Sequence, residues 1–98
     1  IVELEDLGFC AKGEGGPFAA SGAIELGGSL PINTHGGMLS HCHPGNPGSM
    51  FALTESVFQL RGSVAAERQV KGAEVAMVHA QGGIMSSHTS LILGNEVN

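Results

Sequence analysis

The chain has 98 residues, enough for one domain or a part of one, and its formal net charge is −5. A content of 42% hydrophobic and 13% charged residues is typical of a globular protein and excludes a disordered or highly solvated chain. Only four residues are basic, so the chain has no positive surface for nucleic acid, and no apolar run approaches the roughly 20 residues that span a bilayer.

Two cysteines, Cys10 and Cys42, fit neither a disulfide framework nor a Cys-x-x-Cys motif. They indicate free thiols in a reducing compartment. The first residues are acidic where a signal peptide would be basic. We therefore expect a cytoplasmic protein with no membrane span.

The opening residues "IVELEDLG" predict the last two turns of an amphipathic helix. Ile1, Leu4 and Leu7 fall on one face, and Gly8 is a plausible cap. Because the chain starts inside this pattern and without methionine, we expect it to be a piece of a longer protein. Residues 9–28 have little periodicity and many turn residues, which predicts a long excursion with one short extended piece at most.

The middle of the chain predicts a strand, a loop and a helix. Residues 29–33, "SLPIN", form a short apolar run that predicts the strand. The next stretch, "NTHGGMLSHCHPGNPG", is too rich in glycine and proline to be helical. Residues 49–62 then predict a helix with Ser49 as its N-cap and Gly62 as its stop. Apolar residues cover most of its circumference, which predicts that it is buried on two sides.

The last part of the chain predicts a hairpin. Residues 63–72 are a polar connection expected at the surface, and the small apolar run of Val75–Ala80 is typical of a strand buried on both faces. Residues 88–94 predict a second strand, and Gly82 and Gly83 fall in the turn between them. The order strand, helix, strand, strand predicts an α/β fold with a right-handed parallel crossover and an antiparallel last strand on a mixed sheet.

Three stretches together carry a family resemblance: "LEDLGFCAKGEGGPF", "LPINTHGGMLSHCHPGNPG", and "QLRG" followed by "RQVKGAEVAMVH". The second is similar to a loop that reads Ile-Asn-x-x-Gly-Gly-x-x-Ser-x-Gly-His-Pro. In this order they resemble the C-terminal end of the thiolase fold, specifically the lipid-transfer, sterol-carrier-protein type and its thiolase-like relatives. The resemblance implies that residues 1–98 are an incomplete thiolase C-terminal domain, part of a layered αβαβα architecture.

Thiolases make or break a carbon–carbon bond next to a CoA thioester, and the resemblance implies this chemistry here. The family's nucleophilic cysteine lies in the N-terminal half, so neither cysteine of this chain corresponds to it. No cofactor is implied, because the CoA thioester is the substrate. The piece by itself is therefore expected to be inactive.

The resemblance implies roles for individual residues. His43 matches the catalytic histidine of the Gly-His-Pro loop, where its N–H would stabilise negative charge on a thioester oxygen. His79 stands where the sterol-carrier group also has a histidine and is a second catalytic candidate, with a buried structural histidine as an equal alternative. Gly82 and Gly83 would supply backbone N–H groups to an oxyanion hole, or merely serve the turn.

The loop before His43 holds two further candidates and one departure from the family. His35 and Asn33 are candidates for substrate binding, with a plain loop role equally open for His35. Cys42 replaces the family's glycine, and a residue with a side chain would strain the loop if that glycine has a left-handed conformation.

Two other classes of function stay open. One is a non-catalytic or aldolase-type thiolase-like subunit that works with a partner protein. The other is a small metal-binding module built from His35, His41, Cys42 and His43, which we expect less because three adjacent residues do not easily face one ion. Kinship implies a homodimer or tetramer, acyl-CoA as ligand, and a possible partner with an OB fold and a zinc ribbon.

Overall fold

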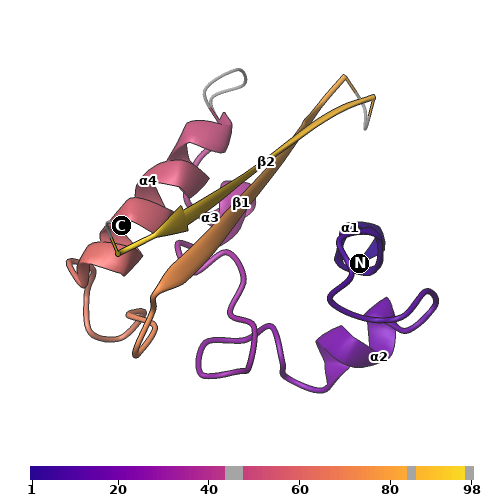
Figure 1. Cartoon of the computed structure of the whole chain (residues 1–98), viewed down its shortest axis with the longest axis horizontal. Coiled ribbons are helices and arrows are strands. Elements are labelled where there is room, and N and C mark those ends of the chain that lie inside the picture. The colour runs from indigo at the N-terminus through magenta and orange to yellow at the C-terminus, as the bar shows by residue number, and fades with distance from the viewer. Residues whose placement is uncertain (44–47, 84–85, 97–98) are drawn as a thin grey trace. The chain divides into compact units, whose positions relative to one another are not determined.

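A computed structural model describes residues 1–43, 48–83 and 86–96. The chain divides into two compact units, Ile1–Ile32 and Asn33–Asn98, and each is considered by itself. No helix in the described ranges is both long and apolar enough to cross a membrane. Figure 1 shows the helices of both units and the single hairpin of the second.

The first unit begins with helix α1, Val2–Asp6, which confirms the predicted helix end. Gly8 follows it with φ +87°, a left-handed conformation that glycine adopts without steric cost. The Leu7 and Phe9 amides bond back to the carbonyls of Glu3 and Leu4. The sequence therefore identified both the helix and the residue that ends it.

A second helix, α2, Gly15–Ala20, lies in the segment predicted to be an excursion with an extended piece, so that prediction was wrong. Pro17 stands in the first turn, where its missing N–H costs no hydrogen bond. Glu5 Oε2 accepts a bond from the Gly15 amide at 3.0 Å. A Cβ at Gly15 would come within 2.7 Å of side-chain atoms of Ile1 and Glu5, so a larger residue there would displace these side chains.

The strand predicted for residues 29–33 does not form. The amides of Leu30 and Ile32 donate to the carbonyls of Ala23 and Ile24, at 2.8 and 3.1 Å, and Pro31 between them has no N–H. These bonds fold the segment onto a preceding loop instead of onto a strand. An apolar run becomes a strand only where another extended segment pairs with it.

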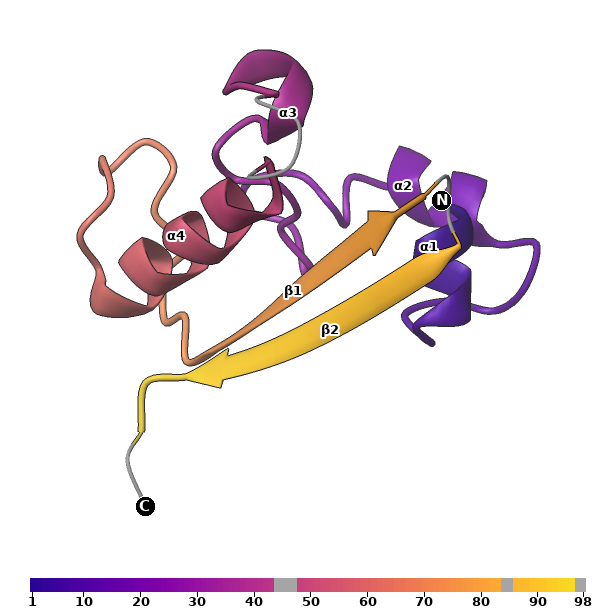
Figure 2. The ribbon, with the colours of Figure 1, turned by 90° about the horizontal axis from the view of Figure 1, so that it is seen from above.

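The second unit contains helices α3, Gly37–Ser40, and α4, Gly48–Arg61, followed by strands β1, Val75–Gly82, and β2, Ser87–Gly94. Helix α4 starts at Gly48, one residue before the predicted cap, and Gly62 ends it with φ +67°. Figures 1 and 2 both show α4 lying alongside the hairpin.

The hairpin is antiparallel, and its register pairs Val75 with Gly94 and Gly82 with Ser87. This confirms the predicted hairpin. The described residues contain this one two-stranded sheet, so the parallel crossover and mixed sheet expected from residues 29–33 are not formed within them.

One face of the hairpin packs against α4, and the other face is open. Val78 is buried, and Leu93 on the same face lines a hollow with Val57 and Leu60 of α4. On the opposite face Val75 and Ile92 keep 69% and 72% of their surface exposed. The prediction that β1 is buried on both faces is therefore wrong for the described chain, because only one covering layer is present.

Helix α4 is covered on two sides, as predicted, but only the side against the hairpin is apolar, and the second covered side is polar. Glu55 and Gln59, one turn apart, keep 7% and 6% of their surface, whereas Met50 and Phe58 are exposed. The connection predicted at the surface supplies part of the cover, since Arg68, Gln69 and Val70 are half-buried against this polar side.

Candidate functional site

The loop from Asn33 to His43 carries three of the predicted site residues. Asn33 has φ +51°, and its carbonyl accepts a bond from the Gly36 amide at 2.8 Å. Gly36 has φ +96°, and a Cβ there would lie 2.7 Å from Ser40 Cβ. Asparagine is among the residues that best tolerate the left-handed region, so this Asn–Gly pairing forms a tight turn at low steric cost.

His35 is half-buried, and its Nδ1 is inaccessible and has no hydrogen-bond partner. Its ring centroid lies 5.2 Å from that of His41, which lies 5.2 Å from that of Phe51 on α4. Burial lowers the pKa of His35, and His41 and Arg68 lower it further, while Glu55 opposes them. The surroundings of His35 therefore disfavour the charged form of its imidazole.

A network of polar side chains fixes the start of this loop to α4. Thr34 Oγ1 donates to Glu55 Oε1 at 2.9 Å, and Gln59 Nε2 donates to Thr34 Oγ1 at 3.1 Å. Arg68 donates two hydrogen bonds to the same carboxylate, from Nε to Oε1 at 3.0 Å and from a terminal nitrogen to Oε2 at 3.2 Å. Gln59 also accepts from the Val70 amide at 2.9 Å. Loop, helix and connection therefore meet at one carboxylate.

The electrostatics of Glu55 follow from these contacts. Burial alone would raise the pKa of its carboxyl, but hydrogen bonds from Arg68, Gln59 and Thr34 outweigh burial and lower the pKa to about 2. The sequence analysis missed this network. Its signal was the polar pair Glu55 and Gln59, one turn apart on the helix, with Arg68 beyond the helix end.

His43 is exposed at the end of the loop, directly after the half-buried Cys42. Asn33 is the one described non-glycine residue with positive φ, so Cys42 does not have the left-handed conformation that would require glycine. The expected strain from Cys42 is therefore absent. Pro44, the third residue of the predicted motif, lies outside the described residues.

The metal hypothesis needs the loop's His35, His41, Cys42 and His43 to converge. Within the described residues 33–43, no three of their ligand atoms lie within 4.8 Å of one another. His35 and His41 do meet, but as tilted rings at an interplanar angle of 59°. The arrangement favours ring packing over a shared ion.

His79 lies elsewhere, on the open face of β1. Its Nδ1 is 2.8 Å from Ser90 Oγ on β2, and its Nε2 is 3.2 Å from Nδ1 of His88. The two imidazoles stack, with centroids 5.3 Å apart and an interplanar angle of 24°. His79 therefore belongs to a polar cluster at the turn end of the hairpin, and both ring nitrogens have side-chain neighbours.

Gly82 is the last residue of β1, paired with Ser87, and Gly83 follows it in the predicted turn. Gly83 has φ +60°, and Ser86 Oγ donates to its carbonyl at 2.6 Å. The Ser86 amide bonds to the Gly82 carbonyl at 3.1 Å. These contacts show a role in turn geometry, and the oxyanion role of the two amides stays a prediction.

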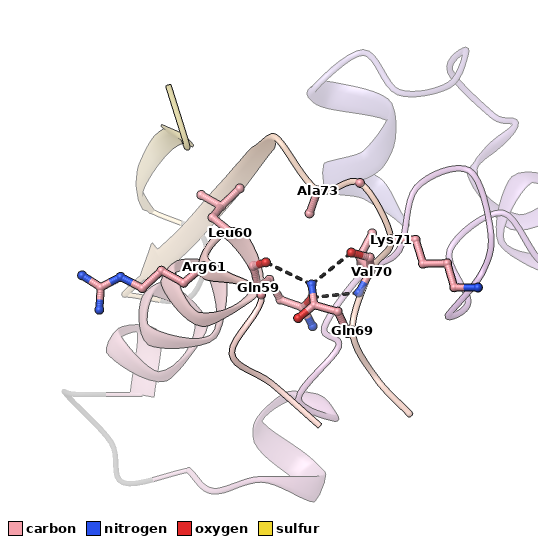
Figure 3. A pocket seen from close by; sticks show the side chains of 9 residues that line it. Gln59, Leu60, Arg61, Gln69, Val70, Lys71 and Ala73 are labelled. Carbon is pink, nitrogen blue, oxygen red and sulfur yellow. Dashed lines mark hydrogen bonds between the residues drawn. The ribbon is translucent and has the colours of Figure 1, made fainter. Parts of the chain in front are cut away.

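A shallow hollow of about 340 Å³ lies where the C-terminal end of α4 meets residues 69–73. Gln69 Nε2 donates to the carbonyls of Gln59 and Val70 across it. Figure 3 shows Arg61 and Lys71 pointing away from this hollow in opposite directions. Its polar groups therefore join the connection to the helix, and neither of the two charged side chains among its described lining residues points into the cavity.

A model of the family described as "thiolase C-terminal domain-like" matches residues 1–95 of this chain. The chain belongs to this family. Membership in the thiolase C-terminal domain-like family confirms the predicted α/β class and the resemblance read from the three sequence stretches.

Named relatives come from several kinds of protein. A 17-hydroxy-3-oxo-4-pregnene-20-carboxyl-CoA lyase of Mycobacterium tuberculosis is 47% identical over 94 residues, covering 96% of this chain and 22% of the relative. An acetyl-CoA acetyltransferase of Methanothermobacter thermautotrophicus is 43% identical over 83 residues, 85% of this chain and 21% of the relative. Rat sterol carrier protein 2 is 39% identical over 82 residues, which cover 84% of this chain and 15% of the relative. The chain thus spans about a fifth of its relatives' length or less.

Proposed function

We propose that this chain is the C-terminal catalytic segment of a thiolase-like acyl-CoA C-acyltransferase, completed by an upstream part that carries the nucleophilic cysteine. The observation that carries the proposal is the family match over residues 1–95, which includes the loop of His43. Similarity to an acetyl-CoA acetyltransferase supports the same class of reaction. The substrate is a CoA thioester, and no resident cofactor is required.

In this proposal His43 donates its N–H to the oxygen of a thioester as negative charge develops there. Its exposed position at the loop end leaves the imidazole accessible to a ligand. Asn33 and His35, fixed at the other end of the loop, contact the substrate. His79, Gly82 and Gly83 at the turn end of the hairpin form the second group of donors.

The open face of the hairpin supports a larger assembly. Val75, Met77 and Ile92 expose 69%, 36% and 72% of their surface on one side of a two-stranded sheet. Burying apolar surface is favourable by about 25 cal/mol per Å² of surface removed from water. We infer that the remainder of the cytoplasmic protein, as a homodimer or tetramer, covers this face.

A second candidate is an aldolase-type subunit that works with a partner protein. The observation in its favour is the similarity to two enzymes named for such cleavage, the M. tuberculosis lyase and a steroid side-chain-cleaving aldolase of Thermomonospora curvata, 40% identical over 94 residues. A partner with an OB fold and a zinc ribbon is part of this second proposal.

The test is turnover by the full-length protein, with the 98-residue chain as the matched control. With a 3-ketoacyl-CoA and free CoA, we expect two shorter thioesters to form, because thiolysis transfers the acyl group to the CoA thiol. The chain by itself should give no product. Cleavage of a 3-hydroxyacyl-CoA without consumption of free CoA would favour the aldolase type, and activity in neither assay would refute both.

A further inference from the structure

The polar network on α4 sits directly beneath a proposed substrate-binding segment. Glu55 and Gln59 are nearly inaccessible. The two side chains bond to each other, and their other hydrogen-bond partners in this network lie outside the helix. Burying a carboxylate is costly unless it is paired and hydrogen-bonded, and here every contact is supplied by Thr34, Gln59 and Arg68. An apolar side chain would fill the same position without this requirement.

We propose that Glu55 and Arg68 are positioning residues for the segment Asn33–His35: their ion pair holds Thr34, and through Thr34 it fixes the imidazole of His35. The expected effect on catalysis rests on the proposed function. The positioning itself rests on the hydrogen bond from Thr34 to Glu55 and on the two hydrogen bonds from Arg68 to the same carboxylate.

The geometry favours His35 as the group that is positioned. Thr34 precedes His35 directly, so the bond from Thr34 to Glu55 fixes the backbone from which the imidazole extends. Asn33 and Gly36 close the tight turn around it. The ring is then packed against His41, and its Nδ1 is shut off from solvent without a partner. Buried polar atoms without a hydrogen-bond partner are uncommon in folded proteins, and this one belongs to the segment that the network fixes.

Charge links the same residues. The groups that act on the His35 imidazole are His41 in its own loop, Glu55 on α4 and Arg68 in the connection. Glu55 raises the pKa of His35, and Arg68 lowers it. Because the two effects have opposite signs, the loss of one charge or the other would by itself move the titration of His35 in opposite directions. Release of Thr34 would instead expose the ring in both variants and raise the pKa of His35 in both, because burial is the largest cause of its lowered pKa.

The first experiment is NMR titration of histidine imidazoles in the full-length protein, with His35→Asn to assign the signal. We expect Glu55→Gln and Arg68→Met both to raise the pKa of His35, because each change releases Thr34 and exposes the ring. No shift, or shifts in opposite directions, would overturn the proposal. This readout needs no activity, so it stays valid if the proposed acyltransferase function fails.

A milder pair of variants covers the case in which a charge change prevents folding. Thr34→Val removes the hydroxyl bond to Glu55 and keeps the side-chain shape, while Thr34→Ser keeps the hydroxyl. With a 3-ketoacyl-CoA as substrate, we expect Thr34→Val to lower kcat by about tenfold, since small misplacement of a catalytic group is costly. Thr34→Ser should restore it. A Thr34→Val protein with the wild-type kcat would contradict the positioning role.

Discussion

Replacing His43 with alanine in the full-length protein is expected to lower kcat for acyl-CoA cleavage by about 10²–10³-fold, the cost of removing one oxyanion donor. His43 is exposed at the end of a loop that is fixed at its other end to α4. The loss should therefore be catalytic and should leave the fold unchanged. Because the donor acts mainly in the transition state, KM should change much less than kcat.

Ser40→Ala provides the control in the same loop, because Ser40 is exposed at the end of α3 and has no proposed role. Its kcat should equal that of the wild type. If His43→Ala has the same kcat as Ser40→Ala, His43 is not the oxyanion donor.

Glu55 should make the protein sensitive to acid. The pKa of its carboxyl is about 2 in the folded chain, against 4.5 for an unperturbed glutamate. Since the folded value is the lower one, Glu55 stabilises the fold above pH 4.5, and this contribution is lost as the pH falls toward 2. A difference of this size corresponds to about 3 kcal/mol of unfolding free energy.

Urea unfolding at a series of acidic pH values measures this contribution. Glu55→Gln should be less stable than the wild type at neutral pH and should lack this part of the acid-dependent loss. Glu67→Gln removes an exposed glutamate of the same connection and should keep the wild-type pH profile. If Glu55→Gln and the wild type lose stability in parallel below pH 4.5, the ion pair is not the cause.

The elements with strong local signals could be predicted from the sequence. Gly8 and Gly62 both have positive φ at helix ends, and the two apolar runs around Gly82 form the hairpin. Helix α2 was missed because its segment has little periodicity and many turn residues, although one of these, Pro17, is tolerated in a first turn. The strand at residues 29–33 failed because pairing depends on a partner that local sequence does not specify.

The site shows the same division between local and distant information. The tight turn at Asn33 and Gly36 follows from residue type, whereas the role of His43 comes from the motif alone and stays a prediction. The burial of Glu55 could not be predicted locally, because it depends on Thr34 and Arg68, which lie 21 and 13 residues away in the sequence. Periodicity shows which face of a helix is apolar. A polar face is buried only where residues distant in the sequence supply its hydrogen-bond partners.

The most direct test of the central claim is mass spectrometry of the full-length protein after incubation with an acyl-CoA and rapid acid quenching. A thiolase-like mechanism passes the acyl group through a cysteine, and we propose that this cysteine lies outside residues 1–98. The predicted result is one acyl group per subunit on a cysteine upstream of this chain, with Cys10 and Cys42 unmodified. An acyl group on Cys10 or Cys42, or no acyl-enzyme at all, would contradict the account.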